Sequence, residues 1–231
     1  MEEQNPKTNF CLLFGISANI WMCCWQGGFG IGGNNVVGEI LADQMNWGDD
    51  KDLNNTLISS SAIAGITVGS LAAGSICEIG RRKSILLSNL VTIISTAMML
   101  VLNLWVICVA RFIQAFAAGI ILSGCNLYLA ETIPAHKRTI FGAALNIGVV
   151  SGLLITALFG LALPLAGTPE AKTTQLWRVS VGFGIVPAIL TSLVWLFIYS
   201  KESLKYIVQR GDKNKEALSY LKQIYNLDRE E

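Results

Sequence analysis

Residues 140–163 read IFGAALNIGVVSGLLITALFGLAL and contain no charged side chain. A run of about 20 apolar residues can cross the hydrocarbon core of a bilayer as an α-helix. Its backbone groups must then bond to one another, because lipid offers them no partners. Comparable runs cover 10–33, 56–77, 84–103, 105–129 and 177–199. We therefore predict an all-α polytopic membrane protein, a bundle of six transmembrane helices.

The composition supports this class and excludes others. The 231 residues are 52% hydrophobic and 14% charged, with a net charge of +1, whereas roughly a quarter of an ordinary soluble domain is charged. Such a chain lacks the basic surface that nucleic-acid binding needs. His136 is the single histidine, and the six cysteines lie in or at the ends of apolar runs. We expect no metal site, no disulfide framework, no cofactor and no enzymatic activity.

Two regions are expected, a transmembrane bundle over residues 1–200 and a polar tail over 201–231. In the tail, apolar residues recur at helical spacing on both sides of Gly211 and Asp212. This pattern indicates two short amphipathic helices that lie against the cytoplasmic face; a disordered charged tail is the alternative.

The distribution of basic residues indicates the orientation. Of the 17 Lys and Arg residues, thirteen fall in the termini and in the loops on the same side as the termini, and three fall in the loops of the other side. Since positive residues accumulate on the cytoplasmic side, both termini are predicted to be cytoplasmic, or matrix-facing in an organelle.

Small residues form two ridges and one dense segment. The ridges, with members about four positions apart, are Ser61, Gly65, Gly69 and Ala73 in the second run and Gly148, Gly152, Thr156 and Gly160 in the fifth. Such ridges mark contact faces between helices in lipid. Gly28, Gly30 and Gly33 fit the pattern G-x-G-x-x-G, but the strand and helix of a dinucleotide site are missing around them. We predict instead a broken or bendable membrane helix that lines a cavity.

Uncharged polar side chains lie inside the apolar runs, where their cost in lipid points to a function. The candidate substrate-binding residues are Gln26, Asn34, Asn35, Gln114, Asn126 and Asn146. Their amides suit a neutral polyhydroxylated solute such as a hexose, in one hydrated cavity; interhelical hydrogen bonds without a ligand are the alternative. Arg111 is predicted to reach toward the outer interface, and an ion pair with Glu39 is the other interpretation.

Three motifs lie in the polar loops and at the start of the tail. Gly74, Glu78 and the GRRK of 80–83 resemble the loop G-x-x-x-D-R-x-G-R-R/K, although one residue is missing. The ETIP of 131–134, followed by Arg138, resembles E-x-x-P-x-x-x-R, and KESLK at 201–205 resembles P-E-S-P-R without its prolines. Together they resemble the sugar porter branch of the major facilitator superfamily. The resemblance implies the N-terminal six-helix half of that fold, with a cytoplasmic conformational latch made by Glu78, Arg81, Arg82, Glu131, Arg138 and Glu202.

The resemblance also implies a mode of transport. Asn146 stands where the family has a sugar-binding glutamine, and Gly28 stands near the place of the aspartate that titrates in proton-coupled members. Facilitated diffusion is therefore expected. In the family, helices two and five face a second six-helix half, so the two ridges are expected to be covered by a second copy, a complementary half or other membrane subunits. The alternative is an accessory subunit of a membrane complex, derived from a transporter and without transport of its own.

Overall fold

The computed structural model describes residues 9–165, 167–199, 201–209 and 214–225, apart from the side chains of Asn34, Asn35 and residues 214–217. Within these ranges the regular structure is entirely helical. The helices are α1 (Phe10–Gln44), the 3₁₀ turn η1 (Gly48–Asp50), α2 (Lys51–Cys77), α3 (Arg81–Met98), α4 (Leu104–Thr132), α5 (Ala135–Leu161), α6 (Pro169–Thr173), α7 (Leu176–Gly182), α8 (Ile185–Phe197), α9 (Leu204–Gln209) and α10 (Asn214–Tyr225).

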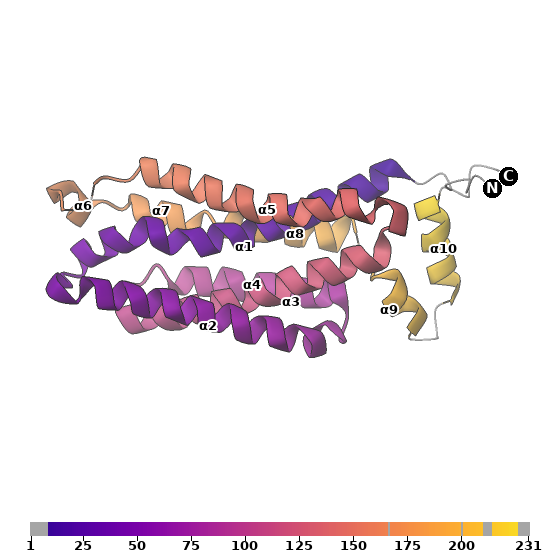
Figure 1. The fold of residues 1–231 in the computed structure, drawn as a ribbon, viewed down its shortest axis with the longest axis horizontal. Coiled ribbons are helices and arrows are strands. Elements are labelled where there is room, and N and C mark those ends of the chain that lie inside the picture. The colour runs from indigo at the N-terminus through magenta and orange to yellow at the C-terminus, as the bar shows by residue number, and fades with distance from the viewer. Residues whose placement is uncertain (1–8, 166, 200, 210–213, 226–231) are drawn as a thin grey trace.

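The long helices run side by side along the molecule, and α9 and α10 lie at one end of the bundle (Figure 1). The most extensive contacts join α2 to α4 and α1 to α5, and α3 packs on α4 and α8. At the α9–α10 end the backbone N–H of Asn9 donates to the carbonyl of Ile224 (2.8 Å). We call this the terminal end and the opposite one the distal end.

Asparagine side chains fix where two of the long helices begin. The Asn9 side chain accepts a hydrogen bond from the N–H of Leu12 (3.2 Å) at the start of α1. The Asn103 side chain accepts from the N–H groups of Trp105 (3.0 Å) and Val106 (3.3 Å) at the start of α4. These bonds satisfy N–H groups that the first turn of a helix leaves without a partner.

Six segments cross the bundle, as the apolar runs predicted. Five of them, α1, α2, α4, α5 and the α7–α8 pair, are long and apolar enough to span a membrane. The sixth, α3, has lower hydropathy because serine, threonine and asparagine line one of its faces. Those residues, Ser84, Ser88, Asn89, Thr92, Ser95 and Thr96, are buried, whereas Leu87, Leu90 and Ile94 are exposed. This inside-out pattern fits a helix with lipid around its outer face.

Helix α1 differs from its prediction. It runs without interruption to Gln44, so the expected break at its glycines is absent and the helix extends well beyond the predicted run 10–33. Gly30 lines a cavity, as the prediction had it, whereas Gly28 and Gly32 allow close packing on α5. A Cβ on Gly28 would lie 2.0 Å from the carbonyl oxygen of Val149, and one on Gly32 would lie 3.1 Å from Thr156.

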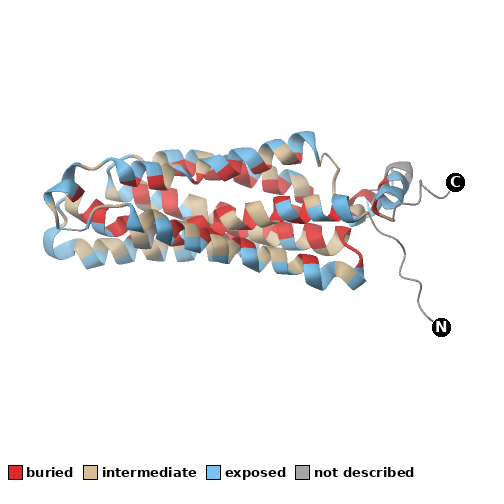
Figure 2. Cartoon of the chain, turned by 90° about the horizontal axis from the view of Figure 1, so that it is seen from above, coloured by how far each residue is buried: buried red, intermediate tan, exposed pale blue. Residues whose placement is uncertain are grey.

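The two small-residue ridges pack inside this chain. A Cβ on Gly69 would lie 2.2 Å from the carbonyl oxygen of Phe116 on α4, and a Cβ on Gly152 would lie 2.1 Å from that of Trp25 on α1. The expectation that the ridges face a second half is therefore wrong, because α4 and α1 already cover them. The outward faces of α2 and α5 are exposed and apolar, at Leu71 and Ile147 for example. Exposed residues lie along the outside of the bundle (Figure 2).

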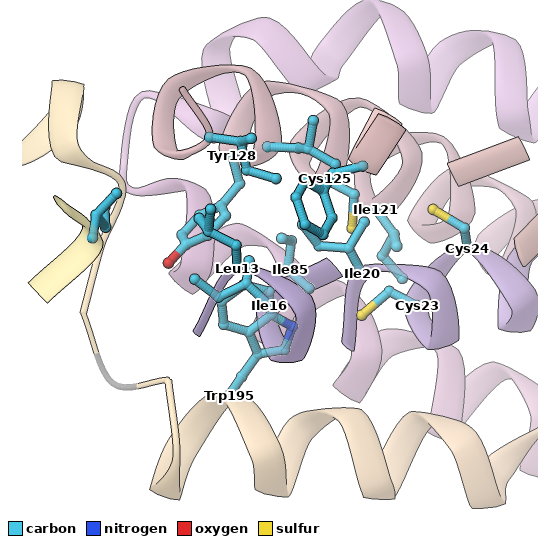
Figure 3. Close-up of a cluster of buried hydrophobic side chains, with 14 of the residues drawn as sticks. Leu13, Ile16, Ile20, Cys23, Cys24, Ile85, Ile121, Cys125, Tyr128 and Trp195 are labelled. Atoms are coloured by element: carbon cyan, nitrogen blue, oxygen red, sulfur yellow. The ribbon is translucent and has the colours of Figure 1, made fainter. Parts of the chain in front are cut away.

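The larger hydrophobic core lies in the terminal half of the bundle, where side chains from α1, α4 and α8 point toward one another (Figure 3). The rings of Tyr128 and Trp195 meet edge to face, with centroids 4.8 Å apart. A smaller core around Trp177 holds α1, α2, α4 and α7 together nearer the distal end.

Candidate functional site

A cavity of about 280 Å³ lies between α1, α2 and α4, with Thr92 of α3 at its wall. Its lining is mostly apolar, with Ser59, Gln26, Arg111 and Gln114 among the polar exceptions, and no carboxylate of the described residues lines it. A concave and largely apolar site with a few convergent polar groups is the usual form of a small-molecule site. Of the predicted polar set, the structure brings Gln26 and Gln114 together in this cavity.

Gln26 lines this cavity with an amide that has no hydrogen-bond partner among the described residues. The residue is 5% exposed, and both its amide nitrogen and its amide oxygen are buried without a hydrogen-bond partner among the described residues. An unsatisfied buried amide is costly, and one donor and one acceptor side by side match the hydroxyl groups of a neutral polyol. A bound solute with hydroxyl groups would remove that cost.

Arg111 lies in the interior and not at the outer interface, so the predicted position of its side chain is wrong. It is 4% exposed, and its Nη1 donates to the carbonyl of Gly30 (2.7 Å) and to Oε1 of Gln114 (3.1 Å). The amide nitrogen of Gln114 donates in turn to the hydroxyl of Thr96 (3.1 Å). The alternative partner, Glu39, forms an ion pair with Lys51 at the distal end.

The remaining predicted polar residues lie elsewhere. Asn126 and Asn146 line a second cavity, about 430 Å³, between α4 and α5, together with Arg138. Asn126 donates to the carbonyl of Leu122 one turn earlier (3.0 Å). The side chains of Asn34 and Asn35 lie outside the described residues.

One face of α4 connects the two cavities. The residues of α4 that line the first cavity include Arg111, Ala115 and Ala118, and those that line the second include Leu122 and Asn126. These positions recur three or four residues apart and therefore share a face of the helix. Leu122 also stands beside Gly27 of the first cavity, because a Cβ there would lie 3.8 Å from its side chain. The cavities thus follow each other along α4.

Four of the six predicted latch residues form one network at the terminal end. Arg81 and Glu131 make a largely buried ion pair, 2.9 Å from Nη2 to Oε1. The two oxygens of Glu202 accept hydrogen bonds from the backbone N–H groups of Arg82 (3.0 Å) and Lys83 (3.3 Å), in the first turn of α3. The Arg82 side chain donates to the carbonyl of Trp195 (2.8 Å). The network ties α3 to α4, to α8 and to the segment before α9.

The other two latch residues, Glu78 and Arg138, are exposed and lie outside this network. Sequence reasoning in turn missed two of its members. The Ser203 hydroxyl donates to Glu131, and the Tyr206 hydroxyl donates to the carbonyl of Ile79 (2.6 Å). The KESLK segment was a usable signal for Ser203, since that residue follows Glu202 directly.

The tail contributes one further contact that the sequence did not indicate. The hydroxyl of Tyr220 on α10 lies 3.2 Å from that of Tyr128 on α4, and Tyr128 also donates to the carbonyl of Lys201 (3.3 Å). Tyr220 and Ile224 are buried in the larger core. Burial raises the pKa of the Tyr220 phenol above its ordinary value. Helix α10 is therefore docked on the bundle through Tyr220 and Ile224.

Within the described ranges, no group of three or more His, Cys, Asp and Glu side chains is arranged to hold a metal ion. The three cysteines of the larger core, Cys23, Cys24 and Cys125, are free and buried. The candidate binding site is the cavity between α1, α2 and α4, where the Gln26 amide has no hydrogen-bond partner among the described residues.

The family model of sugar (and other) transporters matches residues 11–231. The chain belongs to this family. It is 26% identical over 189 residues to hexose transporter 1 of Plasmodium vivax (strain Brazil I), covering 78% of this chain and 37% of that protein. It is 27% identical over 216 residues to the facilitated glucose transporter member 3 of Oryctolagus cuniculus, covering 87% of this chain and 42% of that protein. The chain thus spans about two fifths of these relatives.

Solved structures show the same fold. The proton:xylose symporter XylE of the major facilitator superfamily, bound to 6-bromo-6-deoxy-D-glucose, matches with a TM-score of 0.83 at 19% identity, covering 94% of this chain and 50% of that chain. The inward open conformation of XylE from E. coli matches with a TM-score of 0.74 at 17% identity, covering 94% and 56%. The fold is that of half a major facilitator bundle, in a multi-pass membrane protein of a transporter family whose members are not enzymes.

Proposed function

We propose that this bundle forms one half of a facilitative carrier for a neutral polyhydroxylated solute such as a hexose. The observation that carries the proposal is the Gln26 amide, buried without a partner in the cavity between α1, α2 and α4. A sugar hydroxyl can donate to its oxygen and another can accept from its nitrogen. The names of the relatives, hexose and glucose transporters, support the same solute class.

Facilitated diffusion follows from the charges around the cavity. Among the residues that the structure describes, no acidic side chain lines it, and so none of these carboxylates is placed to take up and release a proton with the solute. The hydrogen-bond acceptors of Arg111 are a carbonyl and an amide, both neutral. Transport should therefore run down the solute gradient and be indifferent to a proton gradient.

Alternating access requires a second bundle that rocks against the first. We assign the contact with this second bundle to the exposed apolar faces of α2 and α5. The second bundle would be a second copy, a complementary half or another membrane subunit. With both termini cytoplasmic, the network of Arg81, Glu131 and Glu202 would lie on the cytoplasmic side and would hold the helix ends there in one arrangement.

The test is D-glucose entry into cells that lack hexose uptake and that co-express this chain with the C-terminal half of the rabbit transporter. We expect saturable entry that a protonophore does not change. Gln26→Leu should abolish or greatly reduce it, and the matched change Gln175→Leu, at an exposed position outside the cavity, should not. Entry that does not saturate, or that is equal in both variants, would overturn the proposal.

A further inference from the structure

A small cavity of about 30 Å³ lies between α1, α4 and α7, next to the candidate binding site. Its walls include Phe29 and Leu41 of α1 and Trp177 of α7. Arg111 of α4 lines both this small cavity and the candidate site, and therefore stands between them. The space suits one water molecule or one ion of similar size, and it is far smaller than a site for an organic ligand.

Two side chains in the walls of the small cavity each have an N–H group without a hydrogen-bond partner among the described residues. These groups are Nε of Arg111 and Nε1 of Trp177, in residues that are 4% and 0% exposed. Both groups donate and neither can accept. Because a buried donor without a partner is costly, an occupant that accepts hydrogen bonds would stabilise this arrangement.

Arg111 also brings a positive charge that has only neutral partners among the described residues. Its Nη1 donates to the carbonyl of Gly30 and to the amide oxygen of Gln114. No acidic side chain of the described residues lines either of the two cavities that Arg111 borders. A charge inside a membrane helix is normally paired, because an isolated ion is far more costly to bury than a neutral polar group. The group that would compensate Arg111 is therefore an anion.

The polar groups in the walls favour an anion over a water molecule. A buried water typically makes about three hydrogen bonds, as donor and as acceptor. The amide oxygen of Gln114 already accepts from Arg111 (3.1 Å), so the unpaired side-chain groups of the walls are donors. A monatomic anion accepts from several donors and has no hydrogen of its own to satisfy. Arg178 adds positive charge nearby, with its guanidinium carbon 5.3 Å from the centroid of the Trp177 ring.

We propose that the small cavity binds one chloride ion through the N–H groups of Arg111 and Trp177. The ion would compensate the guanidinium beside the candidate site and would tie α4 to α7. This binding requires neither a solute in the candidate site nor a second bundle, so it is measured on the full chain without either of them.

The test is thermal unfolding of the full chain in detergent, followed by circular dichroism, in sodium chloride or in sodium gluconate at equal ionic strength. We expect the unfolding midpoint to rise with chloride concentration and then to level off, because a ligand stabilises the state that binds it. The rise should be about 3–6 °C at about ten times the dissociation constant. Gluconate, an organic anion too large for this cavity, should produce no such rise.

Two matched variants separate the cavity from a general effect of salt. Trp177→Phe keeps an aromatic ring and removes the Nε1–H group. It should raise the chloride concentration that gives half of the effect about tenfold, the contribution of one hydrogen bond to a charged group. Trp105→Phe removes the same group at a position that is 71% exposed, and it should leave that concentration unchanged.

Arg111→Met removes the positive charge and should abolish the chloride dependence. Circular dichroism reports whether this variant is folded, and Trp177→Phe carries the test if it is not. Equal midpoints of the wild type in chloride and in gluconate, the result for a cavity that holds water only, would overturn the proposal. The same chloride dependence in Trp177→Phe as in the wild type would also overturn it.

Discussion

Arg81 and Glu131 form an ion pair of 2.9 Å that joins the first turn of α3 to the last turn of α4. Both side chains are largely buried, so each charge depends on the other for compensation. Removal of one partner from such a pair leaves an unpaired charge in a medium that solvates it poorly, at a cost of about 3–5 kcal/mol.

Glu131→Gln should therefore lower the free energy of unfolding by about 3 kcal/mol. The measurement is equilibrium unfolding in mixed micelles, followed by circular dichroism. Glu78→Gln is the matched control, because Glu78 is exposed at the same end, and it should change the free energy by less than about 0.5 kcal/mol. Similar losses in the two variants would contradict the assignment of Arg81 to Glu131.

Glu202 caps the start of α3 from a position far along the chain. Its oxygens accept from two N–H groups of the first turn, and loss of such a cap costs about 1 kcal/mol. Glu202→Ala should show that loss in the same unfolding measurement. Gly80→Ala should cost at least as much, because Gly80 has a φ of +144° and its Cβ would lie 2.8 Å from the Glu202 carboxylate. A neutral effect of both changes would argue against the cap.

The contact between α2 and α4 depends on glycine. In Gly69→Ala the new Cβ would lie 2.2 Å from the backbone oxygen of Phe116, and such overpacking costs about 1–3 kcal/mol. Gly74→Ala, in the same helix but with no atom within 4 Å, should be neutral or stabilising, because alanine favours helix. Thermal unfolding of the two variants in one detergent checks the difference. Equal midpoints would show that α2 is not held this closely.

Docking of α10 should depend on pH through Tyr220. Burial raises the pKa of this phenol above its ordinary value, so the neutral form is favoured while α10 is docked. The stabilisation is fully present below a pH of about 10, the pKa of a free tyrosine, and is lost as the pH rises through the raised value. The difference in phenolate absorbance between wild type and Tyr220→Phe should appear only above that pH. Ionisation of Tyr220 at or below pH 10 would contradict its burial against Tyr128.

The lengths of the uncharged apolar runs were sufficient to predict six segments along the bundle, because a bilayer imposes a length on every helix that spans it. The spacing of small residues also identified the ridge on α2 at Gly69. It did not identify α4 as the helix that packs there, because spacing defines a face of one helix and not the helix that contacts it. The place of Arg111 was predicted wrongly for a related reason. Its depth depends on the carbonyl of Gly30 and on Gln114, and the contact with Gly30 joins two helices far apart in the sequence.

The candidate site was predictable in part. Polarity inside an apolar run singled out Gln26 and Gln114, and the structure brings both to one cavity. The same criterion singled out Asn146, which the structure places with Asn126 in a different cavity. Which cavity a polar residue lines depends on how neighbouring helices are placed relative to one another. The residue pattern within one helix does not determine that placement.

The most direct test of a sugar-binding cavity beside Gln26 is protection of an introduced thiol. The rate at which a water-soluble maleimide alkylates Ala62→Cys, in the co-expressed carrier with Cys11→Ser as background, is measured with and without D-glucose. Ala62 lines the cavity, and the matched site Ala64→Cys is exposed on α2 and does not line it. The account predicts that D-glucose, and not L-glucose, slows alkylation at position 62 alone. Equal rates with both sugars at position 62, or equal slowing at position 64, would contradict it.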